Sequence, residues 1–293
     1  GADAKGLFIA IIVGIISVEL LRFLSSVRAL QVRMPDGVPQ GVADAFNNMF
    51  PMMIVVTLVG LVTTLLLRFG IPNIINVFYD MFQKPFMSLT STLPAAIILA
   101  FVPPFLWFFG IHGANMIDPF MQLINAPAIE ANAAAIAAGK APEYIVNKAF
   151  FDAFVNMGGT GTTIALLIAI FLVARKNKKM STISSLSIGP GLFNINEPVL
   201  FGLPIVLNPI FFIPFVFGPV VLSTVAYLLT SAKLIPVATV VIPWVTPPVV
   251  GGVLATQSIQ GGVLAAFNLL LMVLIYIPFV VIANRADEKE QEM

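Results

Sequence analysis

The chain has 293 residues, of which 59% are hydrophobic and 10% charged, and its mean hydropathy is +1.00. Soluble domains carry about 25% charged residues, so this composition cannot cover a water-facing surface and indicates an integral membrane protein. The net charge of +1 is uninformative as a total, and no nucleic-acid partner is expected. The chain has no cysteine and one histidine, which excludes disulfides and cysteine-rich or multi-histidine metal sites. We expect no metal and no other cofactor.

The fold class follows from long apolar runs. Runs that approach or exceed the ~20 residues needed to span a bilayer lie at 6–24, 48–67, 92–109, 150–174, 199–230 and 259–283. The first run lacks a small-residue cleavage site, so we expect a membrane helix there rather than a signal peptide. Prolines divide 199–230 into two expected elements, and proline and glycine make 235–256 a poor continuous helix. We predict an all-α integral membrane protein, a polytopic helical bundle.

Residues 71–90 are predicted to form an amphipathic linker helix. Apolar side chains recur on one face of that segment, at Ile74, Ile75, Phe78, Met81, Phe82 and Phe86. Such a helix lies on the membrane or links two parts of a protein, and the alternative is a half-buried core helix. The alanine-rich residues 125–148 are expected to form a helical connection outside the hydrocarbon.

Basic residues cluster at Arg22, Arg28 and Arg33 and again at Arg175 to Lys179, within the sequence ARKNKKM. The positive-inside rule places both clusters in the cytoplasm, together with the charged tail 285–293. Two helices plus a re-entrant hairpin between the second cluster and the tail would place both on one side. The proline-led segments 93–107 and 235–249 resemble each other, and interrupted segments in two halves indicate a transport site near the membrane midplane.

Glu197 is the acid that the surrounding sequence explains least. Glu19 has Arg22 at helical spacing, Asp118 precedes a proline, and Asp152 could cap or line a helix. Glu197 instead lies in GPGLFNINEPV beside Asn194, Asn196 and Pro198. An uncompensated carboxylate in hydrocarbon costs ~3 kcal/mol or more, and irregular backbone at that depth is tolerated where it lines a cavity. The segment indicates either a cavity-lining turn that binds a polar ligand or a surface loop with a solvated Glu197.

His112 lies in PPFLWFFGIHGAN, with Gly113 and Asn115 following it. Imidazole exchanges protons near neutral pH, and the adjacent glycines would let a ligand approach the backbone. A lone histidine is otherwise a structural residue. Trp107 and Trp244 lie in the proline-interrupted runs, where tryptophan either marks the membrane interface or stacks on a sugar ring.

A third polar cluster is NMGGTGTT, Asn156 to Thr163, within the apolar run 150–174. It lacks the GK[ST] ending of a P-loop. Its glycines and hydroxyls, Thr160 included, would either pack helices closely or offer amides to a ligand.

GIHG, NMGGTGTT and especially GPGLFNINEPVLFGLPIVLNP resemble the membrane component (enzyme IIC) of bacterial phosphotransferase-system sugar transporters, in the lactose, cellobiose and diacetylchitobiose family. The resemblance implies a dimerisation-type region at 1–70, the linker helix 71–90, a sugar-binding transport domain with re-entrant hairpins at 91–284, and the cytoplasmic tail 285–293. The family has further spans before the equivalent of Gly1, which suggests a truncated chain and leaves the dimer geometry open.

The resemblance also implies site residues. His112 and Glu197 match the family's catalytic histidine and acid, Trp107 and Trp244 its sugar-stacking tryptophans, and Asn156 the asparagine of the glycine-threonine cluster. Further expected sugar ligands are Gly113, Asn115, Thr160, Asn194 and Asn196. We expect Glu197 to fix the sugar and His112 to lie nearest the reacting primary hydroxyl, with either as the base. His112 lies far from any basic cluster, which disfavours a phospho-carrier role.

The expected function is a disaccharide permease of the cellobiose or diacetylchitobiose type that works by alternating access in the bacterial cytoplasmic membrane as a multi-pass protein. Its expected partners are a second copy, the bilayer and a cytoplasmic enzyme IIB that supplies the phosphoryl group, because this chain has no cysteine to carry one. The alternatives are a proton-coupled secondary carrier and a non-transporting scaffold. The particular disaccharide and the identity of the base stay open.

Overall fold

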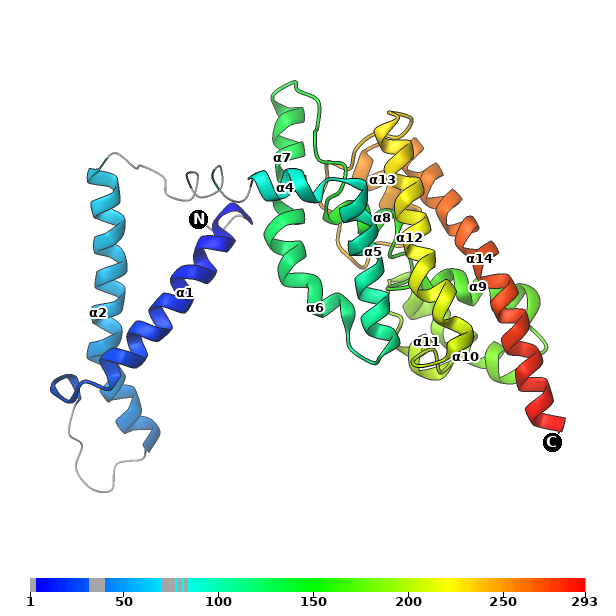
Figure 1. Ribbon diagram of the computed structural model, residues 1–293, viewed down its shortest axis with the longest axis horizontal. Coiled ribbons are helices and arrows are strands. Elements are labelled where there is room, and N and C mark those ends of the chain that lie inside the picture. The colour runs from blue at the N-terminus through cyan, green and yellow to red at the C-terminus, as the bar shows by residue number, and fades with distance from the viewer. Residues whose placement is uncertain (1–3, 32–39, 70–76, 78–80, 82–83, 293) are drawn as a thin grey trace. The chain divides into compact units, whose positions relative to one another are not determined.

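The computed structural model describes residues 4–31, 40–69, 77, 81 and 84–292, and all secondary structure in them is helical (Figure 1). The predicted all-α fold is thereby confirmed. The chain divides into two compact units, Gly1–Pro85 and Phe86–Met293. The division falls inside the predicted linker 71–90, and the dimerisation and transport roles of the two parts stay predictions.

The first unit is a pair of apolar helices, α1 (Ala4–Ser25) and α2 (Gln40–Arg68), with a 3₁₀ turn, η1 (Arg28–Leu30). The Ser25 hydroxyl donates to Asn48 Oδ1 at 2.7 Å and joins the two helices. Much of their remaining surface is exposed and apolar, with Ile15 61% and Val56 68% exposed. Apolar surface on this scale suits contact with lipid or another protein rather than with water.

The predicted amphipathic helix at 71–90 lies mostly outside the described residues. The described part forms the short helix α4 (Lys84–Thr90).

The second unit is organised around packed long helices. Helix α12 (Pro209–Ser231) packs against α5 (Leu93–Phe108) and α14 (Ile259–Glu292), and α14 also packs against α9 (Thr163–Val173) (Figure 1). Three described helices are long and apolar enough to cross a membrane: Ala43–Arg68, Pro209–Ser231 and Ile259–Lys289. The protein is therefore a membrane protein with a helical core.

The apolar run 150–174 is two helices, so the prediction of one span there was wrong. Helix α8 (Lys148–Phe154) ends before the glycine-threonine loop, and α9 starts after it. Gly159 and Gly161 have φ values of 96° and 82°, and Thr162 has 55°, which a right-handed helix cannot accommodate. The break brings the polar loop 155–162 into the middle of an apolar unit.

Two other predicted interruptions are confirmed. The run 199–230 forms α11 (Glu197–Gly202) and α12, and residues 235–249 are non-helical before α13 (Val250–Thr256). The alanine-rich 125–148 is helical only as far as α7 (Ala126–Ala137). Helix α7 follows α6 (Gly113–Phe120) and a π-helical segment, η3 (Met121–Asn125). Helix α10 (Lys178–Leu192) lies between α9 and α11.

Candidate functional site

Glu197 and His112 face each other at the starts of two short helices. Glu197 is the first residue of α11, and His112 is the N-cap of α6. Their closest atoms, His112 Nε2 and Glu197 Oε1, are 3.7 Å apart, and the side chains are 39% and 45% exposed. This separation is too long for a direct hydrogen bond. Both groups therefore keep free capacity for a ligand placed between them.

The hydrogen bond that caps α6 fixes the tautomer of His112. The backbone N–H of Asn115 donates to His112 Nδ1 at 3.2 Å. Because Nδ1 accepts, the proton of the neutral imidazole resides on Nε2, the nitrogen that faces Glu197. The site thus presents one donor and one carboxylate acceptor to the same space, an arrangement suited to a hydroxyl group.

Trp107 supports His112 from the end of α5. The two ring centroids lie 4.4 Å apart, and the Phe201 ring packs against Trp107 in an edge-to-face arrangement with a centroid separation of 6.2 Å. Trp107 is only 4% exposed, whereas Trp244 is 56% exposed in the non-helical segment 235–249. Trp244 is therefore an exposed residue in this conformation, and Trp107 is in contact with His112.

Two of the residues predicted around His112, Gly113 and Asn115, serve the local fold. A Cβ at Gly113 would overlap the backbone of Pro103, so glycine here allows α6 to pack against α5. Asn115 uses its backbone N–H for the α6 cap, and its side chain is exposed. Asn156 is half-buried at the start of the glycine-threonine loop. Their role as sugar ligands stays a prediction.

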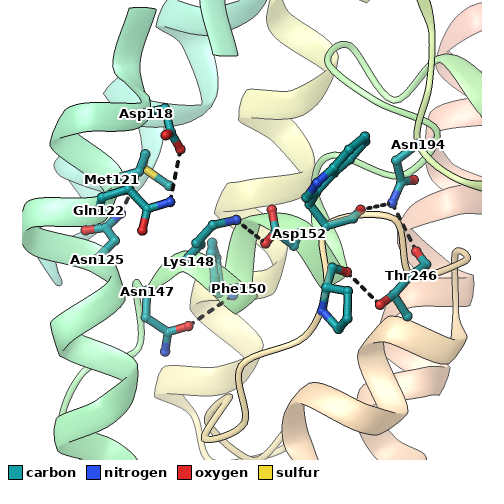
Figure 2. Close-up of polar contacts among 12 residues, drawn as sticks. Asp118, Met121, Gln122, Asn125, Asn147, Lys148, Phe150, Asp152, Asn194 and Thr246 are labelled. Carbon is teal, nitrogen blue, oxygen red and sulfur yellow. Dashed lines mark hydrogen bonds and ion pairs between the residues drawn. The ribbon is translucent and has the colours of Figure 1, made fainter. Parts of the chain in front are cut away.

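Asn194 and Asn196 tie the Glu197 turn to other loops. Asn194 Nδ2 donates to the carbonyls of Trp244 (2.6 Å) and Thr246 (3.0 Å) (Figure 2). Its Oδ1 accepts from Gly158 N–H at 2.6 Å. Asn196 Nδ2 donates to the carbonyl of Thr160 at 2.8 Å. The amides expected to bind sugar are thus engaged within the protein, where they join three irregular segments.

The sequence reasoning missed the ion pair of Lys148 and Asp152 on α8. Lys148 Nζ lies 2.7 Å from Asp152 Oδ2, and the side chains are 23% and 13% exposed (Figure 2). The signal was available, because the residues are four apart and face the same side of a helix. The ammonium group of Lys148 therefore compensates the carboxylate of Asp152. Asp118, within α6, accepts from Gln122 Nε2 at 3.3 Å.

Two polar residues of α14, Asn268 and Tyr276, were also missed. The Tyr276 hydroxyl donates to the carbonyl of Gly161 at 2.7 Å, and Asn268 Nδ2 donates to the carbonyl of Phe154 at 2.9 Å. Both side chains are fully buried. They hold the two ends of the glycine-threonine loop, and their signal was a polar side chain inside an apolar span.

Comparisons with known proteins agree with this architecture. The family described as "Phosphotransferase system, EIIC" matches residues 1–219. The oligo-beta-mannoside-specific EIIC component of Bacillus subtilis is 40% identical over 98% of this chain and 66% of its own length. The cellobiose-specific EIIC component of Lactococcus lactis is 34% identical over 98% of this chain and 62% of its own length.

A solved structure is also similar. The crystal structure of the transporter ChbC, the IIC component of an N,N′-diacetylchitobiose-specific phosphotransferase system, aligns with a TM-score of 0.87 and 35% identity. The alignment covers 99% of this chain and 67% of that one. The chain spans slightly less than two thirds of the curated relatives named above. The family match and this structural likeness together show that the chain belongs to the phosphotransferase-system EIIC family.

Proposed function

We propose that this chain is the sugar-binding and sugar-translocating part of an EIIC permease for a β-linked disaccharide. The observation that carries the proposal is the pairing of His112 Nε2 with Glu197 Oε1 across 3.7 Å, with both groups accessible. The relatives named above are designated for oligo-β-mannosides, cellobiose and diacetylchitobiose, all β-linked sugars. The exposed ring of Trp244 supplies the flat apolar surface on which a pyranose stacks.

The reaction assigns a role to each side chain. A primary hydroxyl placed between the two residues would accept a hydrogen bond from His112 Nε2–H and donate one to Glu197. As its oxygen attacks phosphorus, the S–P bond to the phosphocysteine of enzyme IIB breaks and the O–P bond forms. The hydroxyl proton passes to the Glu197 carboxylate, and the thiolate leaves with enzyme IIB. Positioning and charge stabilisation supply most of the acceleration in such transfers.

The remaining elements of the proposal concern the cell. The protein acts in the bacterial cytoplasmic membrane as a multi-pass homodimer, and its sugar site is exposed alternately to the two faces. The phosphorylated disaccharide is released on the cytoplasmic side, where enzyme IIB binds.

The test is transfer of the phosphoryl group to sugar in proteoliposomes. Labelled cellobiose or diacetylchitobiose outside the vesicles should appear inside as the phosphate ester when phosphorylated enzyme IIB is enclosed. Unphosphorylated enzyme IIB is the matched control and should give no ester. Uptake of unmodified sugar driven by a proton gradient alone would instead establish a secondary carrier.

A further inference from the structure

Trp244 lies on an irregular segment between α12 and α13. Residues 235–249 are non-helical, yet the backbone is fixed at both ends. Near the start, the carbonyl of Ala238 accepts from Asn132 Nδ2 (3.2 Å) and Asn147 Nδ2 (3.1 Å). Near the end, the carbonyls of Trp244 and Thr246 accept from Asn194. Asparagine side chains therefore help to hold this segment, together with the backbone N–H groups of Thr239 and Val240, which donate to the carbonyl of Ala255 at 2.8 and 3.2 Å.

Asn194 is placed where its side chain reaches two other segments at once. Its φ of 63° is left-handed, a conformation that asparagine adopts more readily than most residues. That turn directs the amide toward the carbonyls of Trp244 and Thr246 (Figure 2), while Oδ1 accepts from Gly158 N–H. Both amide protons are engaged, so the Nδ2 group has no donor left for a ligand.

The hydrogen bonds of the Asn194 side chain, here called the Asn194 staple, connect two features of the proposed site. Glu197 lies three residues after Asn194, at the end of the same turn, and the Trp244 carbonyl that Asn194 holds belongs to the residue with the exposed ring. One sugar molecule can contact both residues, Glu197 through a hydroxyl and Trp244 through a ring face. It can do so only if the Glu197 turn and segment 235–249 keep a fixed spacing.

We propose that Asn194 is a positioning residue that sets the place of the Trp244 ring relative to Glu197 and makes no direct contact with sugar. The inference rests on the proposed function, since it assigns Asn194 a part in recognition of a β-linked disaccharide. It predicts that Asn194 contributes to affinity only while the Trp244 ring is present.

A double-mutant cycle on sugar affinity tests this dependence. Asn194→Asp keeps the shape and the acceptor for Gly158 N–H, but it replaces the donating NH₂ by an oxygen that faces two carbonyls. In full-length protein we expect this change to weaken binding of cellobiose or diacetylchitobiose about tenfold. Trp244→Ala should weaken binding as well, and adding Asn194→Asp to Trp244→Ala should cause no further loss. Independent, multiplying losses would overturn the proposal, because they would mean a direct contact or an unrelated defect.

A spectroscopic readout separates positioning from a general loss of stability. Trp107 is buried, so quenching by iodide reports on Trp244, the other tryptophan of the chain. Bound sugar should protect Trp244 in the wild type and protect it much less in Asn194→Asp at saturating sugar. Undiminished protection would overturn the proposal. If Asn194→Asp fails to fold, Asn194→Gly keeps the left-handed turn, removes all three bonds, and enters the same cycle with the same expected result.

The matched control is Asn208→Asp. Asn208 Oδ1 caps α12 by accepting from Ile210 N–H at 3.0 Å, and aspartate performs that role equally well. This control adds the same charge and should bind sugar as the wild type does; equal weakening by both variants would overturn the proposal. A wild-type protein that binds neither sugar refutes the proposed function itself, whereas normal wild-type binding with an additive cycle refutes only the role of Asn194.

Discussion

His112 has one ring nitrogen left for chemistry, because the other accepts the hydrogen bond that caps α6. To take a proton at Nε2, neutral His112 would first have to move its own proton to Nδ1 and lose the cap. Glu197 has no such constraint, since no hydrogen bond within the described residues is recorded for its carboxylate and His112 lies 3.7 Å away. The geometry therefore favours Glu197 as the proton acceptor and His112 as the donor that orients the hydroxyl, a more specific division than the sequence provided.

This division predicts unequal effects of two glutamine substitutions. Glu197→Gln removes the proton acceptor and should reduce formation of the phosphate ester by about 10²–10⁴-fold, the contribution of a positioned base. His112→Gln supplies a new amide donor and should retain more activity. The measurement is the single-turnover rate at saturating sugar with phosphorylated enzyme IIB. Greater loss in His112→Gln would reverse the assignment.

The two tryptophans should differ in what their loss affects. Trp244→Ala removes an exposed ring, so sugar affinity should fall by the equivalent of roughly 1 kcal/mol or more with little change in thermal stability. Trp107→Ala leaves a cavity under His112, so the melting temperature should fall as well, because burying such a ring stabilises by about 3–5 kcal/mol. Calorimetric titration measures the sugar affinity of both variants, and thermal unfolding measures their melting temperatures. Unchanged affinity in Trp244→Ala would assign that exposed ring to the membrane interface, and unchanged affinity in Trp107→Ala would leave the buried ring a structural role alone.

At the scale of elements, the glycine-threonine loop is held on both sides. Tyr276 and Asn268 of α14 bind its ends, and the Asn194–Asn196 turn packs directly on Gly159. A Cβ at Gly159 would lie 2.6 Å from Asn196 Cγ and 2.9 Å from the Asn194 carbonyl, and the φ of Gly159 is 96°. Any side chain at this position must displace the turn that carries Glu197.

Gly159→Ala should therefore impair both stability and sugar binding. The matched control is Gly139→Ala, since Gly139 has a similar left-handed φ of 68° but open space around its Cβ position. The control should show only the conformational cost of alanine, about 1–2 kcal/mol. The excess loss of stability in Gly159→Ala, and its loss of sugar affinity, report contact with the turn. Equal effects of Gly159→Ala and Gly139→Ala would show that contact with the turn adds nothing to the cost of a side chain at Gly159.

The sequence predicted elements well where proline marked their ends, and less well where glycine did. Prolines at fixed φ divided 199–230 correctly into α11 and α12. The run 150–174 was misread because glycine is compatible with a helix or a turn, and the choice depends on partners such as Tyr276, which is more than a hundred residues away in the chain. The pairing of His112 with Glu197 came from family resemblance. The use of Asn194 as a staple could not be foreseen, because an amide in a polar turn serves a ligand or the protein equally well.

At the scale of the whole molecule, the basic loop between α9 and α10 is joined to the end of α14. Asn177 Nδ2 donates to Asn284 Oδ1 and Asp287 Oδ2, both at 3.1 Å, and Lys179 Nζ lies 3.7 Å from Asp287. Arg175, Lys176 and Lys178 are exposed beside this junction. A fixed, positively charged surface is suited to electrostatic guidance of an acidic partner.

Charge reversal of this surface should slow transfer from enzyme IIB without weakening sugar binding. The variant is Arg175→Glu with Lys176→Glu and Lys178→Glu, which leaves the contact of Lys179 with Asp287 intact. The transfer rate should fall and lose its dependence on ionic strength, because screening acts on the attraction that was removed. Lys140→Glu, at an exposed position in another loop, is the control. Unaltered transfer kinetics would leave the cluster with a role in membrane orientation alone.

The compensated pair on α8 and the uncompensated acid on α11 have an electrical consequence. Asp152 is paired with Lys148, whereas the ion pairs of the described residues give Glu197 no lysine or arginine partner, so an ionised Glu197 adds one negative charge to the site. In the proposed transport cycle, a site that moves between the two faces would carry that charge through the membrane potential, whose work is about 2.3 kcal/mol per elementary charge for each 100 mV crossed. In a cell with a negative interior, this work would drive the empty site of the proposed carrier outward, toward the supply of sugar. The membrane voltage would then assist the outward return of the empty carrier. This effect would be independent of phosphorylation, which would keep the imported sugar inside the cell.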